Sequence, residues 1–567
     1  MTDGSLNGFG SLAEPLMDRA ARAPGETALI LIEDDGSERV VTAGELDRAA
    51  AGAAAALAGH GIGTGSVVIL ALRHSVDLPA LLFGALYGGC VASIFPYPPH
   101  AAKMERLGPQ IKELVTQSGA EAVITEPDLG PGLAPALAPL GCRVFTREDL
   151  RPDPEGREPP RPRAFSSGEA FAYLQYTSGA TGRRKGVLLS HRAILNCIRS
   201  FSRAANIAPA DIVVNWLPLY HDYGLFAGLL LGLHAGGTVV LMSPFKWVRR
   251  PQALLWAIHR YRGTMSWMPN SAYSHTARNV PDAALAGLDL GSLRVLGCAS
   301  EPVLHKTQQE FLERFAPHGF REEALRTGYG MAENALAITI SPPGRAAVDW
   351  IDPVALRVER FARQAPAGRP GSRPMVSCGL PVEGVEAAIA DDDGRLLSER
   401  RSGEIVIRSR SLFSGYHRRP DLTAQAFREG WFLTGDIGYL ADGQLYVCGR
   451  KKDLIILAGY NVHPEDVEAA AAAVPGVPDG GLAAFGVTDT GLGTERIILA
   501  CDLNRQVDAA ERLGLEREVR RRVFDELGIT LGEVLISEKR WIARTHNSKV
   551  SRHACRDKYA AEHPDET

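Results

Sequence analysis

Short apolar runs alternate with helix-like segments over the first two thirds of the chain. Strand-like runs lie at 67–72, 122–125, 143–145, 239–241, 265–267 and 293–295. Between them, 42–57 has the composition of a helix, with Thr42 as N-cap and Glu45 completing a capping box, and 78–88 predicts another. Continuous apolar strands between helices favour buried, largely parallel sheets. The pattern predicts an α/β fold.

The pattern changes from Cys378 onwards. Strand-like runs at 384–390, 403–408 and 445–447 predict a small β unit. A last part then combines helices at 464–473 and 513–527 with strands at 483–487 and 497–501, which suits a small α+β domain. We therefore expect an N-terminal domain over 1–450, with its β unit from about 378, and a C-terminal domain over 451–567.

Composition and charge exclude some function classes. The 567 residues carry a formal net charge of −4, so the global basic footprint of a nucleic-acid-binding protein is missing. The apolar run 225–233 is too short to span a bilayer and predicts a buried helix instead, so we expect no membrane insertion. Eight scattered cysteines without C-x-x-C spacing, and no signal-peptide pattern, favour reduced thiols in a cytoplasmic protein.

A stretch rich in glycine and hydroxyl side chains follows the strand-like run 171–175. It contains Thr177, Ser178, Gly179, Thr181, Gly182 and Lys185. Tight backbone turns, hydroxyl groups and one ammonium make an anion cradle of the kind that a triphosphate needs. The order differs from the P-loop of kinases, in which the lysine directly follows the last glycine. An ordinary surface turn is the alternative interpretation of this stretch taken alone.

Other segments line up behind this stretch in a familiar order. They are 216–224 (WLPLYHDYG), 299–302 (ASEP), 328–333 (GYGMAE), 431–436 (WFLTGD), 449–453 (GRKKD) and 547–552 (NSKVSR). This succession resembles the adenylate-forming ligases, which include acyl-CoA synthetases, fatty acyl-AMP ligases, adenylation domains and luciferases. The resemblance spans about residues 10 to 560 and is nearest to the fatty acyl-AMP and fatty acyl-CoA ligases. Segment 341–375 lies where the acyl-AMP ligases carry an insertion.

The resemblance implies that the N-terminal domain holds two αβ lobes and the small β unit, and it implies a role for each matching residue. Thr177, Ser178, Gly179, Thr181, Gly182 and Lys185 would bind the ATP phosphates, and Tyr329 with the backbone of Ser300 and Glu301 would bind adenine. Asp436 would bind the ribose, Arg450 the ribose or phosphates, and Glu333 would ligate Mg²⁺. Lys549 would be the catalytic lysine, on a mobile C-terminal domain that hinges at Lys452. His221 would gate or line the acyl site.

Each of these residues also has a structural interpretation. Tyr329 suits a core or a turn, Glu333 a helix surface, and Lys549 a solvated tail. His221 suits a satisfied structural histidine, and Asp436 suits a turn. The run 225–233, with Trp267 and Met268, suits either a channel for an acyl chain or plain core.

Two departures from the family pattern bear on activity. Asn547-Ser548-Lys549 stands where the family has Ser-Gly-Lys, and losing the glycine removes easy access to positive φ, so we expect slower adenylation. Segment 459–464 is closer to acyl-CoA ligases, whereas segment 341–375 indicates an acyl-AMP ligase. In acyl-AMP ligases the insertion would brace the two domains and hinder the rotation of the C-terminal domain that CoA needs. The acceptor thiol is therefore open between CoA and the phosphopantetheine of an acyl carrier protein.

The expected activity is activation of a hydrophobic, fatty-acid-like or polyketide-like carboxylate by ATP and Mg²⁺ to acyl-AMP, followed by thioester formation. Two alternatives stay open. The chain would be a member with weakened adenylation that mainly transfers acyl groups or binds a carrier protein, or an enzyme that adenylates aryl or amino acids.

Overall fold

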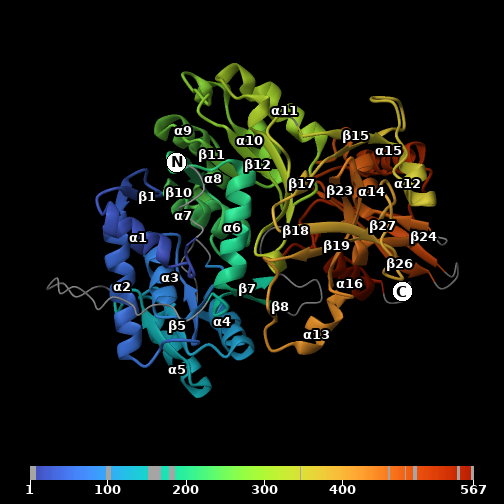
Figure 1. Ribbon diagram of the computed structural model, residues 1–567. Helices are drawn as coiled ribbons and strands as arrows, with labels where there is room; N and C mark the ends of the chain where they lie inside the picture. Colours follow the sequence, from blue (N-terminus) through green and yellow to red (C-terminus); the bar gives the residue numbers. More distant parts are fainter. Residues whose placement is uncertain are drawn as a thin grey trace.

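The computed structural model describes residues 8–97, 104–150, 168–177, 185–344, 346–457, 460–478, 480–489, 494–545 and 549–563. Figure 1 shows two αβ lobes on one side of the molecule and the β unit and C-terminal part on the other. The predicted α/β class is confirmed. Within the described residues, no helix combines the length and apolar character needed to cross a bilayer.

The first lobe is built on a seven-stranded sheet. Its order is β20 (Gly415–Tyr416), β8 (Lys185–Ser190), β7 (Phe171–Thr177), β4 (Val91–Ile94), β3 (Val67–Ala71), β5 (Ala122–Thr125) and β6 (Arg143–Thr146). The run from β7 to β6 is parallel, as the apolar strands predicted, and β8 and β20 add antiparallel strands. The helices of this part are α1 (Glu14–Arg22), α2 (Ala43–Gly59), α3 (Asp77–Tyr87), α4 (Met104–Ser118) and α5 (Gly130–Leu137).

Helix α2 begins with the predicted capping box. The Thr42 hydroxyl accepts from the backbone N–H of Glu45, and the Glu45 carboxylate accepts from that of Thr42 at 2.8 Å. Two of the otherwise unpaired amide groups at the helix start are thereby satisfied.

The second lobe contains a nine-stranded sheet. Its order is β17 (Leu380–Pro381), β14 (Ala337–Ile340), β13 (Leu325–Gly330), β12 (Val295–Cys298), β11 (Met265–Met268), β9 (Ile212–Asn215), β10 (Thr238–Met242), β1 (Thr27–Ile32) and β2 (Glu38–Thr42). Its helices are α6 (His191–Ala205), α7 (Leu231–His234), α8 (Pro244–Arg249), α9 (Gln252–Tyr261), α10 (Asn270–Asn279) and α11 (His305–Phe315). One large apolar core extends over residues of both lobes. The strand expected at 293–295 begins only at Val295, because Leu293 closes a turn by donating to the Leu290 carbonyl.

The apolar run predicted as a buried helix has a wider form than an α-helix. Residues Tyr223–Leu230 form a π-helix (η2), which continues into α7. A Cβ at Gly224 would lie 2.2 Å from the Pro218 carbonyl oxygen, and one at Gly228 would lie 2.3 Å from the Asn215 amide. Both glycines therefore let this helix pack directly on the preceding turn, and π-helical turns frequently mark functional sites.

The β unit and the C-terminal part follow. The β unit comprises β18 (Val385–Ala390), β19 (Gly403–Ser409), β22 (Trp431–Ala441), β21 (Phe427–Arg428) and β23 (Gln444–Arg450), with α13 (Pro420–Gln425) beside it. The insertion-like segment forms β15 (Val348–Ile351), α12 (Pro353–Glu359) and β16 (Arg373–Val376). The C-terminal part contains η7 (Lys451–Asp453), β24 (Ile455–Leu457), β25 (Tyr460–Val462), α14 (Pro464–Ala472), β26 (Leu482–Asp489), β27 (Thr494–Asp502), α15 (Ala509–Leu527), β28 (Glu533–Ser537) and α16 (Arg552–Glu562).

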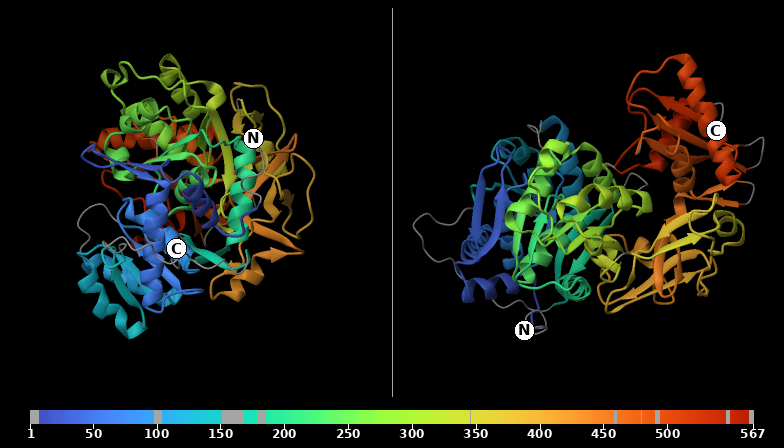
Figure 2. Two further views of the ribbon diagram at one scale, coloured as in Figure 1. Left: turned by 60° about the vertical axis from the view of Figure 1, so that its left-hand side comes forward. Right: turned by 90° about the horizontal axis from the view of Figure 1, so that it is seen from above.

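The C-terminal part has apolar cores of its own. They gather residues between Ile455 and Tyr559, separate from the large core of the lobes. Figure 2 shows this part (red) beside the β unit when the molecule is seen from above. The predicted division at 450/451 and the mobility of the C-terminal domain stay predictions. All eight cysteines are buried free thiols.

Candidate functional site

Three predicted residues converge where strand β13 meets the β unit. The Tyr329 hydroxyl, at the end of β13, donates to Asp436 Oδ2 at 2.6 Å, and Arg450 Nε lies 3.4 Å from Asp436 Oδ1. Asp436 and Arg450 are register partners on β22 and β23. Burial raises the pKa of Asp436, and the charge of Arg450 opposes that rise. The result is an aromatic face beside a largely buried carboxylate and a guanidinium.

The loop after β12 places two further predicted residues. Ser300 has a φ of 70°, a left-handed conformation that is costly for a residue other than glycine and tends to occur at functional sites. The Glu301 carboxylate accepts from the backbone N–H of Ser271 at 2.8 Å and from its hydroxyl at 3.1 Å. The Glu301 side chain is therefore occupied at the start of α10, which leaves its backbone as the group suited to contact a base.

Lys549 reaches the same loop from the far end of the chain. Its Nζ donates to the Ser300 carbonyl oxygen at 2.7 Å, across 249 positions of sequence. Burial lowers the pKa of Lys549, while the carboxylates of Glu301 and Asp222 oppose that effect. In this arrangement Lys549 is a partly buried ammonium held against the Ser300 loop rather than a solvated tail lysine.

Tyr416, which the sequence analysis did not select, contacts both Glu333 and Lys185. The Tyr416 hydroxyl donates to Glu333 Oε1 at 2.9 Å, and Lys185 Nζ lies 4.7 Å from the centre of the Tyr416 ring. Glu333 is only 8% exposed, so it is not a helix-surface carboxylate. Burial raises the pKa of Glu333, and the Tyr416 hydrogen bond opposes that rise.

His221 and Asp222 occupy the turn that leads into the π-helix. His221 Nδ1 lies 2.6 Å from Asp222 Oδ1, and the Tyr223 N–H points at both side chains. Burial alone would raise the pKa of Asp222, but the His221 ring and Lys549 hold it below its usual value. Gln175, on β7, donates to the Tyr220 carbonyl at 2.9 Å and so ties this turn to the strand before the glycine-rich stretch.

The residues expected beside an acyl chain lie deep in the protein. The run 225–233, Trp267 and Met268 are all buried, and the Trp267 ring covers Gly297 so closely that a Cβ there would lie 2.2 Å from Trp267 Cε3. The role of these residues in acyl binding stays a prediction.

Several predicted residues lie outside the described part of the chain. They are Ser178, Gly179, Thr181 and Gly182, with the side chain of Thr177, and also Asn547 and Ser548. Their roles stay predictions.

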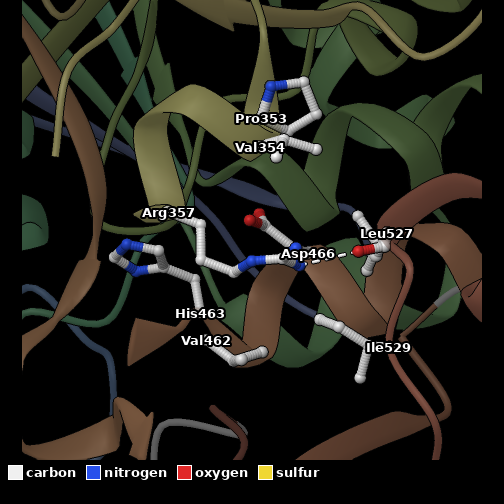
Figure 3. A pocket seen from close by; sticks show the side chains of 8 residues that line it. All are labelled: Pro353, Val354, Arg357, Val462, His463, Asp466, Leu527 and Ile529. Carbon is white, nitrogen blue, oxygen red and sulfur yellow. Dashed lines mark hydrogen bonds between the residues drawn. The ribbon is translucent and has the colours of Figure 1, made fainter. Parts of the chain in front are cut away.

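The insertion-like segment contacts the C-terminal part. The Arg357 guanidinium, on α12, donates to the Leu527 carbonyl at the end of α15 at 2.7 Å (Figure 3). Arg373, on β16, forms an ion pair with Asp466 on α14. Figure 3 shows Arg357 extending across a small pocket that His463 and Asp466 help to line. The segment 341–375 is thus joined to the C-terminal part by two arginines.

A buried ion network connects the Lys549 segment to the start of the C-terminal part. Arg552 contacts both carboxylate oxygens of Glu468, at 2.9 and 2.7 Å. It also lies 2.9 Å from Glu465 and 3.3 Å from Asp453, the last residue of η7. Because Arg552 is three positions after Lys549, this network fixes the base of the segment that carries the lysine.

Among the described residues no group of three or more His, Cys, Asp and Glu side chains has the arrangement of a protein metal cage. A single buried carboxylate such as Glu333 instead suits a hard cation that takes most of its oxygens from phosphates and water. The residues present therefore fit Mg²⁺ bound together with a nucleotide.

Comparisons with known proteins show which family and which relatives the chain is similar to. The family described as AMP-binding enzyme matches residues 16–417. A medium-chain-fatty-acid–[acyl-carrier-protein] ligase, JamA of Moorena producens, is 33% identical over 512 residues, covering 87% of this chain and 85% of its own. A 4-hydroxyphenylalkanoate adenylyltransferase of Mycobacterium marinum is 29% identical over 97% of this chain and 91% of its own. A structure from a study of fatty acyl-adenylate ligases from E. coli and L. pneumophila superposes with a TM-score of 0.89, at 28% identity and full coverage of both chains.

Proposed function

The chain belongs to the family of AMP-binding enzymes, and on that basis we propose that it is a ligase that activates a fatty-acid-like carboxylate with ATP. The acid and ATP give acyl-AMP and pyrophosphate, and a thiol then takes the acyl group with release of AMP. The observation that carries this proposal is the contact of Lys549 Nζ with the Ser300 carbonyl, 2.7 Å long. It sets a partly buried ammonium beside the residues proposed to bind adenosine.

Each step of adenylation has a group suited to it. Tyr329 offers a face for adenine, and Asp436 offers acceptors for the ribose hydroxyls. Attack by the carboxylate oxygen on the α-phosphorus moves negative charge onto pyrophosphate. Lys185, beside the stretch proposed to bind phosphates, and Lys549, beside the residues proposed to bind adenosine, are cations suited to stabilise that charge. Mg²⁺ held by Glu333 would neutralise phosphate charge when bound.

We propose a medium or long fatty acid as the substrate. The name of the Moorena relative specifies medium-chain fatty acids, and the deeply apolar surroundings of the π-helix suit an alkyl chain. The name of the mycobacterial relative favours an aryl-alkanoate, which is the second candidate.

Exchange of labelled pyrophosphate into ATP tests the proposal. With fatty acids, 4-hydroxyphenylalkanoates and amino acids offered singly, we expect exchange that depends on the fatty acid and on Mg²⁺. Exchange driven by an aryl or amino acid alone would replace the substrate class. Exchange at background with every acid, together with binding to a carrier protein, would instead favour a carrier-binding module.

We propose an acyl carrier protein, through its phosphopantetheine thiol, as the acceptor, with the reaction taking place in the cytoplasm. The support is the pair of arginine contacts, Arg357 to Leu527 and Arg373 to Asp466, which join the insertion-like segment to the C-terminal part. Such contacts would resist the rotation that would admit CoA.

The acceptor proposal has a matched test on one segment. Arg357→Ala removes a contact to the C-terminal part, whereas Arg363→Ala removes one to Glu359 on the same segment, at 2.6 Å. Supplied with acyl-AMP and CoA, the Arg357 variant should form more acyl-CoA than the wild type, and the Arg363 variant should not. Equal acyl-CoA formation by all three proteins would contradict the bracing role, and efficient wild-type transfer to CoA would make the chain an acyl-CoA ligase.

A further inference from the structure

A two-residue strand at the edge of the seven-stranded sheet carries Tyr416. Strand β20 pairs antiparallel with β8, with Tyr416 opposite Val187 and Gly415 opposite Leu188. The Tyr416 side chain is buried, at 8% exposure. Its ring packs edge-on against the ring of Phe413, with the two ring centres 4.9 Å apart. Tyr416 is therefore held from one side by strand β8 and from the other by the β unit.

The hydroxyl of Tyr416 acts on one buried carboxylate. It donates to Glu333 Oε1 at 2.9 Å. A hydrogen bond to an ionised carboxylate is stronger than one between neutral groups. The hydroxyl thus fixes the orientation of the Glu333 carboxylate.

The ring of the same residue acts on a lysine. Lys185 Nζ lies 4.7 Å from the ring centre, within the range of a cation–π interaction. Lys185 is the first residue of β8, directly after the glycine-rich stretch. The Tyr416 side chain therefore contacts Lys185, which is assigned to the triphosphate, and Glu333, which is assigned to its metal.

The surrounding backbone does not depend on the hydroxyl. The Phe413 N–H donates to the Glu333 carbonyl at 2.8 Å, the Ser414 N–H to the Leu188 carbonyl at 2.8 Å, and the His417 N–H to the Gly186 carbonyl at 2.7 Å. These bonds hold segment 413–417 against β8 and the Glu333 turn. Removing only the hydroxyl leaves this frame, the ring packing and the Lys185 contact in place.

We propose that Tyr416 is a positioning residue for the metal–triphosphate site, with its hydroxyl holding Glu333 for Mg²⁺ and its ring placing Lys185 against the phosphates. This inference rests on the proposed function, because it takes ATP as the ligand. Its consequence is that binding of ATP with Mg²⁺, but not binding of ATP alone, depends on the Tyr416 hydroxyl, which touches neither.

Calorimetric titration of the full chain with ATP, with and without Mg²⁺, tests the inference. Tyr416→Phe should raise the dissociation constant for Mg·ATP about tenfold or more, the usual scale for a hydrogen bond to a charged group. Binding of ATP in the presence of a chelator should change less than about twofold. Tyr87→Phe is the matched control, because Tyr87 is a buried tyrosine on α3 that donates to Asp47 on α2 at 2.7 Å, and neither residue is assigned to the nucleotide.

A second readout separates positioning from a structural role. In Tyr416→Phe, acyl transfer from supplied acyl-AMP to the carrier thiol should be unchanged. Mg·ATP affinity equal to that of the wild type, an equal loss of affinity with and without Mg²⁺, or a parallel loss of acyl transfer would each overturn the inference.

The outcomes also separate this inference from the proposed function. A wild-type protein that binds Mg·ATP more tightly than the Tyr416 variant, yet forms no acyl-AMP, would refute the function and leave the positioning role intact. A wild-type protein that does not bind Mg·ATP would overturn both.

Discussion

Replacing Lys549 should separate the two half-reactions. The ammonium lies 2.7 Å from the Ser300 carbonyl oxygen and is partly buried beside the residues proposed to bind adenosine. Lys549→Met keeps the length of the side chain and removes its charge. The variant should lose adenylation and retain more of the acyl transfer from supplied acyl-AMP, because only the first step brings a carboxylate against the triphosphate and moves charge onto pyrophosphate.

The size of the loss follows from the geometry. Two unit charges about 4 Å apart interact by about 4 kcal/mol at an effective dielectric constant of about 20. Since about 1.4 kcal/mol of barrier is a factor of ten in rate, the full interaction corresponds to about 10³-fold. Removing one donor from a preorganised anion site costs about 10²- to 10³-fold in known enzymes. We expect a loss in that range for acyl-AMP formation.

The pH profile gives an independent check. Burial lowers the pKa of Lys549, so the ammonium is present at low pH and is lost as the pH rises through this lowered pKa. Wild-type adenylation should therefore decline on the alkaline side, and Lys549→Arg should shift that decline upward because a guanidinium stays charged.

Single-turnover measurement of acyl-AMP formation is the assay. Lys558→Met is the control, because Lys558 belongs to the same C-terminal part and donates to the Trp541 carbonyl at 3.0 Å instead. Adenylation within about fivefold of the wild type in Lys549→Met would refute the reasoning, since the interaction worked out above corresponds to about 10³-fold.

Three further changes have expected outcomes. Asp436→Asn should raise the KM for ATP about tenfold or more with little effect on the KM for the acid, because the carboxylate held by Tyr329 is the proposed ribose acceptor. Steady-state kinetics against each substrate checks this, and an equal change in both KM values would contradict it. Ser548→Gly should speed acyl-AMP formation, measured in a single turnover, and an unchanged rate would show that the missing glycine does not limit adenylation. Glu468→Ala should lower the free energy of unfolding, measured by urea titration, by about 2 kcal/mol. This is less than the roughly 3–5 kcal/mol that breaking an isolated buried pair costs, because Arg552 still contacts Glu465 and Asp453. No measurable change would contradict the buried network.

Local patterns predicted the elements well, and the reasons are physical. The Thr42–Glu45 capping box and the apolar strands depend on short-range chemistry and on burial, both of which are written in neighbouring residues. The apolar run after Tyr223 was predicted as a buried helix but not as a π-helix. Its width depends on Gly224 and Gly228 meeting Pro218 and Asn215, which are contacts that hydrophobic periodicity does not report.

The site was predictable from motifs only as far as the motifs extend. Tyr329 and Asp436 meet across 107 positions, and the resemblance had assigned both to one nucleotide. Tyr416 was missed, because it belongs to a two-residue strand whose pairing with β8 spans more than two hundred positions. The Gly415–Tyr416 pair was the available signal, but a glycine before an aromatic residue is too common to select alone.

Mass spectrometry of the products formed from fatty acids, ATP and Mg²⁺ tests the central claim most directly. The protein should yield acyl-AMP and pyrophosphate, and then an acylated carrier protein with AMP when a holo-carrier is added, with little acyl-CoA when CoA replaces it. ATP cleaved to ADP, or no adenylate from any carboxylic acid offered, would contradict the assignment of this site to acid activation.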